Sequence, residues 1–254
     1  PSNFDSVVKV YFESVLGVAF TNQAMLDGME TFFSERSYNP VLEYMERAAS
    51  NWDGRERINQ MLQVYLGADD NPLISKIAQM WLVGAVAKVY DPYVKFDYVL
   101  DLVGGQGVGK TSLLQKLGGE WYTDAVTDFA NKDNYDIMLK SLIVNDDEMV
   151  ASNRMSFAET KAFISKTSLR FRKPYMKRTE EFAKNFILAR TTNQKEYLKD
   201  KTGERRFLSV MADASKQKKH PMEIEPETIE QIWGEAVTIY KTGVPLMFDE
   251  ETEN

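Results

Sequence analysis

One glycine-rich stretch sets the expectations for the whole chain: Leu102-Val103-Gly104-Gly105-Gln106-Gly107-Val108-Gly109-Lys110-Thr111-Ser112. It contains the pattern G-x-x-x-x-G-K-[ST], which is the phosphate-binding loop of nucleotide hydrolases. The apolar residues 98–103 before it predict a strand, and residues 111–117 after it predict the first turns of a helix. Strand, loop and helix therefore follow one another in the order that such a loop requires.

The residue types of this loop suit phosphate chemistry. Glycines let the backbone turn tightly and direct N–H groups around a phosphate, and the positive end of the next helix faces the anion. We expect Lys110 to reach the β- and γ-phosphates of ATP and the Thr111 hydroxyl to bind Mg²⁺. The alternative is a glycine-rich turn with an accidental Lys-Thr pair. The predicted nucleotide-binding residues are Gly104, Gly105, Gln106, Gly107, Val108, Gly109, Lys110, Thr111 and Ser112.

Length and composition limit the class of protein. The 254 residues, of which 43% are hydrophobic, allow one large domain or two small ones with a sizeable core. The chain has no cysteine and only one histidine, His220, which excludes disulfides and disfavours a zinc site.

No apolar run approaches the roughly 20 residues of a membrane helix, and no signal peptide is visible. We therefore expect a cytoplasmic protein with no membrane partner. The start at Pro1 instead of methionine is typical of a fragment or a processed chain.

Periodicity predicts three regions along the chain. Residues 1–90 are expected to be helical, with apolar spacing over 4–16, 22–33, 40–49, 58–66 and 73–90. Residues 91–210 alternate predicted strands with helices, which indicates an α/β sheet with crossover connections. The strands are expected at 98–103, 142–145, 186–189 and 206–210, and the helices at 134–139 and 157–165. Residues 211–254 begin with a polar loop and continue into an amphipathic helix over 227–240.

An acidic cluster follows the second predicted strand. Asp146, Asp147 and Glu148 come directly after the apolar run 142–145. A nucleotide hydrolase needs carboxylates for Mg²⁺ and for the attacking water. We expect Asp146 or Asp147 to hold the metal, and Asp147 or Glu148 to orient the water. The alternative is a strand followed by an acidic turn without a catalytic role.

Two further positions fit the same chemistry. Asn193 follows the third predicted strand and could hydrogen-bond the γ-phosphate or the water, although strands often end in polar residues. Arg205 and Arg206 follow the turn Gly203-Glu204, where one of them could stabilise transition-state charge as an arginine finger. The alternative for the arginines is a solvated basic turn.

Charge is distributed unevenly along the chain. The net charge of −7 argues against a generally basic nucleic-acid binder. From Glu159 to Arg190, however, nine Lys or Arg residues stand against three Glu. Within this segment, aromatic and basic side chains alternate in a way that suits base stacking and phosphate contact, with a solvated loop or a subunit contact as alternatives. The candidate contacts to single-stranded or forked DNA are Arg172, Lys173, Tyr175, Lys177 and Arg178.

Several short motifs follow one another in a fixed order along the chain. They are Trp52-Asp53-Gly54-Arg55, Val94-Lys95-Phe96-Asp97, the loop 104–111, Lys161-Ala162-Phe163-Ile164-Ser165, Arg172-Lys173-Pro174-Tyr175, residues 191–198 and Gly203-Glu204-Arg205-Arg206-Phe207. Together these motifs resemble the virulence-associated protein E family. The resemblance covers about residues 40–240, and residues 1–39 carry no matching motif.

The resemblance implies a P-loop ATPase related to superfamily 3 helicases and the AAA+ group, found in phages and mobile elements. It implies a three-layer α/β core with a parallel sheet over 91–210, preceded by the helical region 1–90 and followed by the helical segment 211–254. ATP and Mg²⁺ are the implied cofactors. DNA is the implied partner, and a homo-oligomeric ring, with a hexamer favoured, is the implied assembly.

The same resemblance assigns roles to residues. Lys110 and Thr111 take the phosphate and magnesium roles, Asn193 the sensor role, and Arg206 or Arg205 the finger role. The family usually has Glu where Asn145 stands, so the magnesium ligand stays open between Asp146 and Asp147.

The expected function is an ATP-dependent DNA motor, the helicase module of a mobile-element replication protein. The alternatives are an ATPase switch or loading factor without unwinding, and a nucleotide-binding regulatory or virulence module. No primase motif is visible, so priming would need another segment or another protein.

Overall fold

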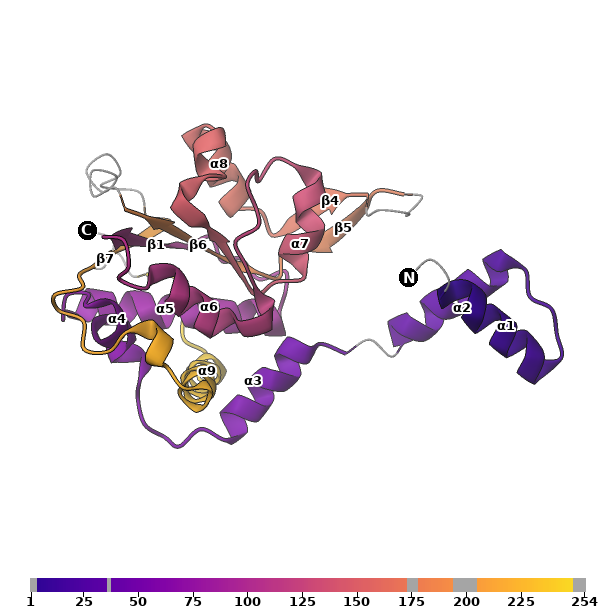
Figure 1. Cartoon of the computed structure of the whole chain (residues 1–254), viewed down its shortest axis with the longest axis horizontal. Helices are drawn as coiled ribbons and strands as arrows, with labels where there is room; N and C mark the ends of the chain where they lie inside the picture. The colour runs from indigo at the N-terminus through magenta and orange to yellow at the C-terminus, as the bar shows by residue number, and fades with distance from the viewer. Residues whose placement is uncertain (1–3, 36–37, 173–177, 194–204, 249–254) are drawn as a thin grey trace. The chain divides into compact units, whose positions relative to one another are not determined.

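The chain divides into two compact units, residues 1–40 and 41–254. The computed structural model describes residues 4–35, 38–172, 178–193 and 205–248. Figure 1 shows the elements of each unit. The phosphate-loop motif and the acidic cluster both lie in the larger unit.

The smaller unit is a pair of helices, α1 (Phe4–Leu16) and α2 (Asn22–Glu35). Both are helices that the apolar spacing predicts. Gly17 follows α1 with a φ of +66°, a left-handed conformation that glycine adopts without strain. The N–H of Phe20 donates to a carboxylate oxygen of Glu13 at 2.9 Å, which fixes the turn between the helices.

A five-stranded parallel sheet forms the centre of the larger unit and confirms the predicted α/β fold. The strand order is β2-β3-β6-β1-β7. The four predicted strands are all present, and each begins one residue later than expected. The bounds are β1 (Val99–Gly104), β2 (Tyr122–Thr123), β3 (Ile143–Asp146), β6 (Ile187–Thr192) and β7 (Phe207–Ala212).

A two-stranded antiparallel hairpin, β4 (Ser168–Phe171) and β5 (Glu180–Ala183), was not expected from the sequence. Each strand has four residues, and Arg170 faces Glu181 across the pair. Strands this short and this charged lack the longer apolar alternation that marks a strand in a sequence. The hairpin lies between β3 and β6 in the chain, and the predicted DNA-contact residues 172–178 come between its two strands in the sequence.

Helices cover both faces of the sheet and give three layers (Figure 1). On one face, α5, α6 and α9 pack with α3 and α4 over a core that includes Leu100, Ile187, Trp81 and Trp233. On the other face, α7, α8 and the hairpin enclose a second core. The helices are α3 (Pro40–Ser50), α4 (Ile58–Leu66), α5 (Pro72–Tyr90), α6 (Lys110–Gly118), α7 (Tyr135–Leu139), α8 (Phe157–Ile164) and α9 (Pro226–Lys241).

Helix α5 is the central helix of the first core. Asn71 caps it by accepting from the N–H of Ile74 at 3.0 Å, and Pro72 occupies its first turn. In the described part of the chain, α5 alone is long and apolar enough for a membrane span by length and composition, contrary to our expectation that no such run exists. Because 72% of that apolar window is buried inside the protein, α5 has the character of a core helix.

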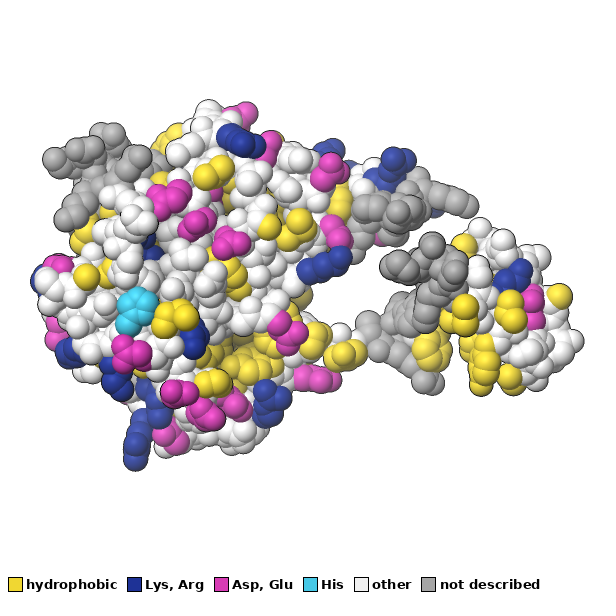
Figure 2. All heavy atoms as spheres, viewed as in Figure 1, with side chains coloured by type: hydrophobic (Ala, Val, Ile, Leu, Met, Phe, Trp, Pro, Cys, Tyr) yellow, Lys and Arg dark blue, Asp and Glu magenta, His cyan; other side chains and the backbone are white. Residues whose placement is uncertain are grey.

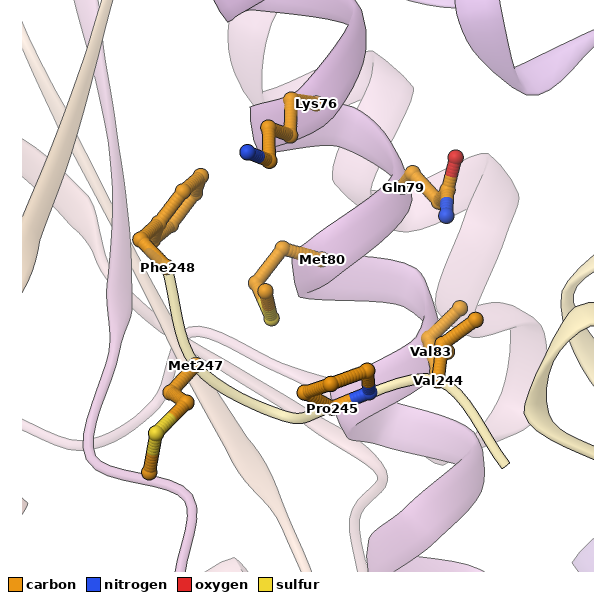
Figure 3. A pocket seen from close by; sticks show the side chains of 8 residues that line it. All are labelled: Lys76, Gln79, Met80, Val83, Val244, Pro245, Met247 and Phe248. Carbon is orange, nitrogen blue, oxygen red and sulfur yellow. The ribbon is translucent and has the colours of Figure 1, made fainter. Parts of the chain in front are cut away.

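The segment after α9 returns along α5. Figure 3 shows Val244, Pro245 and Phe248 facing Met80 and Val83 of that helix around a groove of about 440 Å³. The backbone N–H of Phe248 donates to the hydroxyl of Tyr98 at 3.3 Å. The segment is thereby attached to the residue that precedes β1.

Candidate nucleotide-binding site

The glycine-rich loop joins the end of β1 to the start of α6, as its sequence predicts. Gly107 and Gly109 have φ values of +81° and +89°, which side-chain-bearing residues rarely adopt. A Cβ at Gly104 would lie 2.5 Å from the carbonyl oxygen of Ala212 on β7. Glycine is therefore required twice by backbone conformation and once by the close approach of a neighbouring strand.

Lys110 folds back into the loop that it ends. Its ammonium donates to the carbonyl oxygens of Gly104 at 2.8 Å and Gly105 at 3.0 Å, and to Asn193 Oδ1 at 2.9 Å. Burial lowers the pKa of Lys110, and the nearby carboxylates of the acidic cluster act in the opposite direction. The two residues predicted to contact the same phosphate, Lys110 and Asn193, thus lie in direct contact.

Asp147 collects three donors beside the start of α6. Its Oδ1 accepts from Thr111 Oγ1 at 3.0 Å, from Thr191 Oγ1 at 2.6 Å and from Asn145 Nδ2 at 3.4 Å. Asn145 is fully buried, and its Oδ1 has no hydrogen-bond partner among the described residues. The Thr111 hydroxyl and the Asp147 carboxylate therefore meet, and the unpaired amide oxygen belongs to the side chain of Asn145 that donates to this carboxylate.

These oxygens fit a magnesium ion. Mg²⁺ prefers hard oxygen ligands and is usually held by one or two carboxylates together with substrate phosphates and water. In the described part of the chain, no three His, Cys, Asp or Glu side chains form a protein-only metal site. The residues that fit an ion shared with a nucleotide are Thr111, Asp147 and Asn145.

The carboxylate of Asp146 is engaged elsewhere. It accepts from the backbone N–H of Ala151 at 2.7 Å, from the N–H of Ser152 at 2.9 Å and from the Ser152 hydroxyl. Its burial raises the pKa of Asp146. Because successive strand residues point to opposite faces, Asp146 and its neighbours Asn145 and Asp147 diverge. The predicted metal role of Asp146 stays a prediction, and these contacts give it a structural role in the turn.

Glu148 occupies a strained position after β3. It has a φ of +49°, and Met149 follows with +55°, two consecutive left-handed residues that are not glycine. Such conformations cost free energy and cluster at functional sites. The N–H of Glu148 donates to Thr191 Oγ1 at 3.3 Å, and its carboxylate accepts from Asn193 Nδ2 at 2.7 Å. Asn193 therefore links Glu148 to Lys110.

The predicted finger residues lie away from this site. Arg206 immediately precedes β7, which runs parallel to β1, so it stands at the opposite end of the sheet from the loop. A six-residue strand spans roughly 20 Å. Arg206 Nε lies 3.5 Å from Asp97 Oδ2 and donates to Ser165 Oγ at 3.2 Å, whereas Arg205 is exposed. Neither arginine reaches the loop of its own chain.

Comparison with known proteins places the chain in a family. A family model described as the virulence-associated protein E-like domain matches residues 45–254. The chain belongs to this family. No curated protein matches it significantly.

This virulence-associated protein E-like domain is similar to three solved structures of the C-terminal region of NrS-1. Their sequences are 17%, 17% and 16% identical to it, with TM-scores of 0.46, 0.43 and 0.39. The matches cover 76%, 83% and 78% of this chain and 45%, 46% and 51% of those chains. The chain therefore spans about half the length of the solved chains that it matches.

Two of the five predicted DNA-contact residues of the family member lie beside the β4–β5 hairpin in the described part of the chain. Arg172 and Arg178 are exposed on either side of its tip. On the face drawn in Figure 2, acidic and basic side chains are interspersed over the larger unit instead of forming one basic surface. The remaining candidates, which lie outside the described residues, are Lys173, Tyr175 and Lys177.

Thr191 of the site and one buried ion pair of the sheet were not among the residues that the sequence indicated. Thr191 precedes Asn193 by two positions, so on an alternating strand both side chains reach the same region, a signal that the sequence does contain. The buried pair of Arg190 with Asp101 joins β6 to β1, and the Arg190 guanidinium also lies 4.2 Å from the ring centroid of Phe207. No local pattern indicates that pair, because its partners are distant in sequence.

Proposed function

We propose that this virulence-associated protein E-like domain is a P-loop ATPase with an AAA+-like core. In this proposal it is cytoplasmic and works as the DNA helicase module of a phage or mobile-element replication protein. One observation carries the proposal: Lys110, Thr111, Asp147, Glu148 and Asn193 converge at the carboxyl ends of three adjacent parallel strands, beside a complete loop motif. The crevice at the carboxyl ends of such strands is where open α/β sheets bind ligands.

The residues divide the work of phosphoryl transfer among them. The loop N–H groups and Lys110 would bind the β- and γ-phosphates of ATP, and Thr111, Asp147 and Asn145 would hold Mg²⁺. When bound, Mg²⁺ supplies neutralising charge and orients the phosphates. Glu148 would orient the attacking water and accept its proton, with its carboxylate positioned by Asn193.

The position of the arginines supports an assembly of several copies. Arg205 and Arg206 stand at the end of the sheet opposite the loop, so a finger from either residue can act only on the site of a neighbouring copy. We therefore propose a homo-oligomeric ring, with a hexamer favoured. Within this ring, single-stranded or forked DNA would contact the β4–β5 hairpins.

The test is the ATPase rate with and without single-stranded DNA, measured together with the oligomer mass in the presence of nucleotide. DNA-stimulated turnover that Lys110→Ala abolishes is the expected result, because Lys110 supplies the charge beside the transferred phosphoryl group. Turnover that DNA leaves unchanged would favour a switch or loading factor. Nucleotide binding without hydrolysis would favour a regulatory module.

A further inference from the structure

Two side chains from the segment after β7 contact the outer side of the phosphate loop. The imidazole Nε2 of His220 lies 3.3 Å from the carbonyl oxygen of Gly107. Gln217 Nε2 donates to the carbonyl oxygen of Val108 at 3.0 Å and to that of Tyr65 at 2.6 Å. Two successive peptide groups of the loop are therefore held by side chains from outside the loop.

The hydrogen bonds of His220 determine its tautomer. The backbone N–H of Met222 donates to His220 Nδ1 at 3.2 Å, so Nδ1 is an acceptor and the proton of the neutral ring is on Nε2. Nε2–H then donates to the carbonyl oxygen of Gly107. One ring nitrogen thus caps the short helix Pro221–Glu223, and the other contacts the loop.

These contacts also orient the N–H groups of the loop. In a planar trans peptide the C=O and N–H bonds point in opposite directions, and the described residues contain no cis peptide. Holding the carbonyl of Gly107 toward His220 therefore turns the N–H of Val108 away from it. Holding the carbonyl of Val108 toward Gln217 does the same for the N–H of Gly109. N–H groups of this loop type are the donors that bind phosphate.

The supporting segment is itself anchored. Pro221 packs so tightly on the loop that a Cβ at Gly109 would lie 2.7 Å from Pro221 Cδ. The ammonium of Lys116 on α6 donates to the carbonyl oxygen of Ile224 at 3.0 Å, just beyond the capped helix. The segment is thereby fixed to the helix that follows the loop.

We propose that His220 and Gln217 are positioning residues of the phosphate loop, which direct the N–H groups of Val108 and Gly109 toward the phosphates of a bound nucleotide. The inference rests on the proposed ATPase function. Because ADP and ATP share the phosphates nearest the loop, both nucleotides should depend on these residues.

Two variants of His220 separate its two contacts. In His220→Asn, the amide oxygen takes the place of Nδ1 and keeps the bond from Met222, but the side chain is too short to reach Gly107. In His220→Gln, the amide nitrogen takes the place of Nε2 and keeps the bond to Gly107, but the cap is lost. The measurements are the dissociation constants of ADP and ATP, kcat and KM, thermal unfolding, and hydrogen–deuterium exchange of the loop peptide without nucleotide.

His220→Asn should bind ADP and ATP about three- to tenfold more weakly, the effect of losing one neutral hydrogen bond. Its KM should rise by the same factor with kcat little changed, its loop should exchange faster, and its unfolding temperature should fall no further than that of His220→Gln. His220→Gln should retain wild-type affinity and loop exchange although it unfolds at a lower temperature. Gln217→Met, which leaves the cap intact, should weaken nucleotide binding like His220→Asn.

Wild-type affinity in both His220→Asn and Gln217→Met would overturn the inference. So would a loss of affinity that follows the loss of thermal stability across all three variants, because that pattern indicates a structural role alone. Failure of the wild-type protein to bind any nucleotide is a different result. It would overturn the proposed ATPase function, and the positioning roles with it.

Discussion

Asn193 shows how single residues couple the parts of the site. Its amide oxygen accepts from Lys110 and its amide nitrogen donates to Glu148, so one side chain connects the loop to the acidic cluster. Asp147 is connected differently, through the hydroxyls of Thr111 and Thr191. The two carboxylates therefore have distinct surroundings, and their replacement should have distinct effects.

We expect Glu148→Gln to bind ATP normally and to turn it over roughly 10²–10⁴-fold more slowly, because the amide keeps the shape but cannot accept a proton. Asp147→Asn should instead raise the Mg²⁺ concentration for half-maximal activity, since the amide is a weaker ligand. A Mg²⁺ titration of steady-state ATPase rates measures both effects. Normal rates at all Mg²⁺ concentrations in both variants would show that the acidic cluster is a structural turn without a catalytic role.

Lys184 is a buried charge outside the site. Its ammonium donates to the carbonyl oxygen of Ile164 at 2.6 Å, and burial lowers the pKa of Lys184 to about 7 from its ordinary 10.5. Lys88 is buried as well, and burial lowers the pKa of Lys88 to about 8. Between these values and 10.5 the unfolded chain binds more protons than the folded protein.

The free energy of unfolding should therefore rise as the pH increases from about 7 toward about 10, by up to about 1.4 kcal/mol per pH unit for each lysine. Lys184→Met should be more stable than the wild type at pH 7 and should show a smaller rise. Urea unfolding at pH 7, 8 and 9 gives the comparison, with the exposed Lys132→Met as the control. Equal slopes in Lys184→Met and the wild type would show that Lys184 does not release a proton on folding.

The position of the predicted DNA contacts depends on one element, the β4–β5 hairpin. The β4–β5 hairpin lies in the chain between β3 and β6, the two strands that Glu148 and Asn193 follow. Leu169 and Phe171 of β4 are buried in the second core. A contact made by Arg172 or Arg178 would thus lie on the part of the chain that connects β3 to β6.

We expect the double variant Arg172→Ala/Arg178→Ala to bind single-stranded DNA more weakly and to lose DNA stimulation while its basal ATPase rate is kept. Two lost phosphate contacts should lower the slope of log affinity against log salt concentration by roughly 1.4. Fluorescence anisotropy at several salt concentrations measures this slope.

The matched control is Arg47→Ala/Lys241→Ala, which removes two basic side chains from the helical layer on the other face of the sheet. An equal loss of DNA affinity in the control would show that the hairpin does not form the DNA contact.

In the proposed ring, the arginines before β7 would make the activity depend on the whole assembly. Arg206 interacts with Asp97 and Ser165 of its own chain, at the end of the sheet away from the loop. An arginine finger supplied by another subunit is worth roughly 10³–10⁵ in rate. Turnover should therefore rise more than linearly with protein concentration until the ring is complete.

Arg206→Ala should bind ATP yet hydrolyse it roughly 10³-fold more slowly or worse. Mixing it with Lys110→Ala should restore part of the activity, because one subunit then offers the finger and the other an intact loop. Asp97→Asn is the control, since it breaks the same ion pair and leaves the arginine in place. If Asp97→Asn loses as much activity as Arg206→Ala, or if mixing restores nothing, Arg206 is a structural partner. Arg205 would then be tested in the same way.

Contiguous residues carry enough information for the local structure of this protein. The helices, four of the five sheet strands and the glycine loop follow from apolar periodicity and from a motif within one short stretch. The conformations of Gly107 and Gly109 are likewise local, since positive φ values are a property of the single residue. Short elements cannot be predicted in this way. The β4–β5 hairpin was not predicted because each of its strands has only four residues, too few to show an apolar periodicity.

The tertiary structure alone decides which of the candidate residues meet. Parallel pairing in the order β3-β6-β1 brings Asn193 between Lys110 and Glu148, three residues that are far apart in the chain. The same register turns Asp146 to the other face and sends Arg206 to the far end of the sheet. Strand order and the face of each side chain depend on pairing between distant segments, and local periodicity contains no information about those partners.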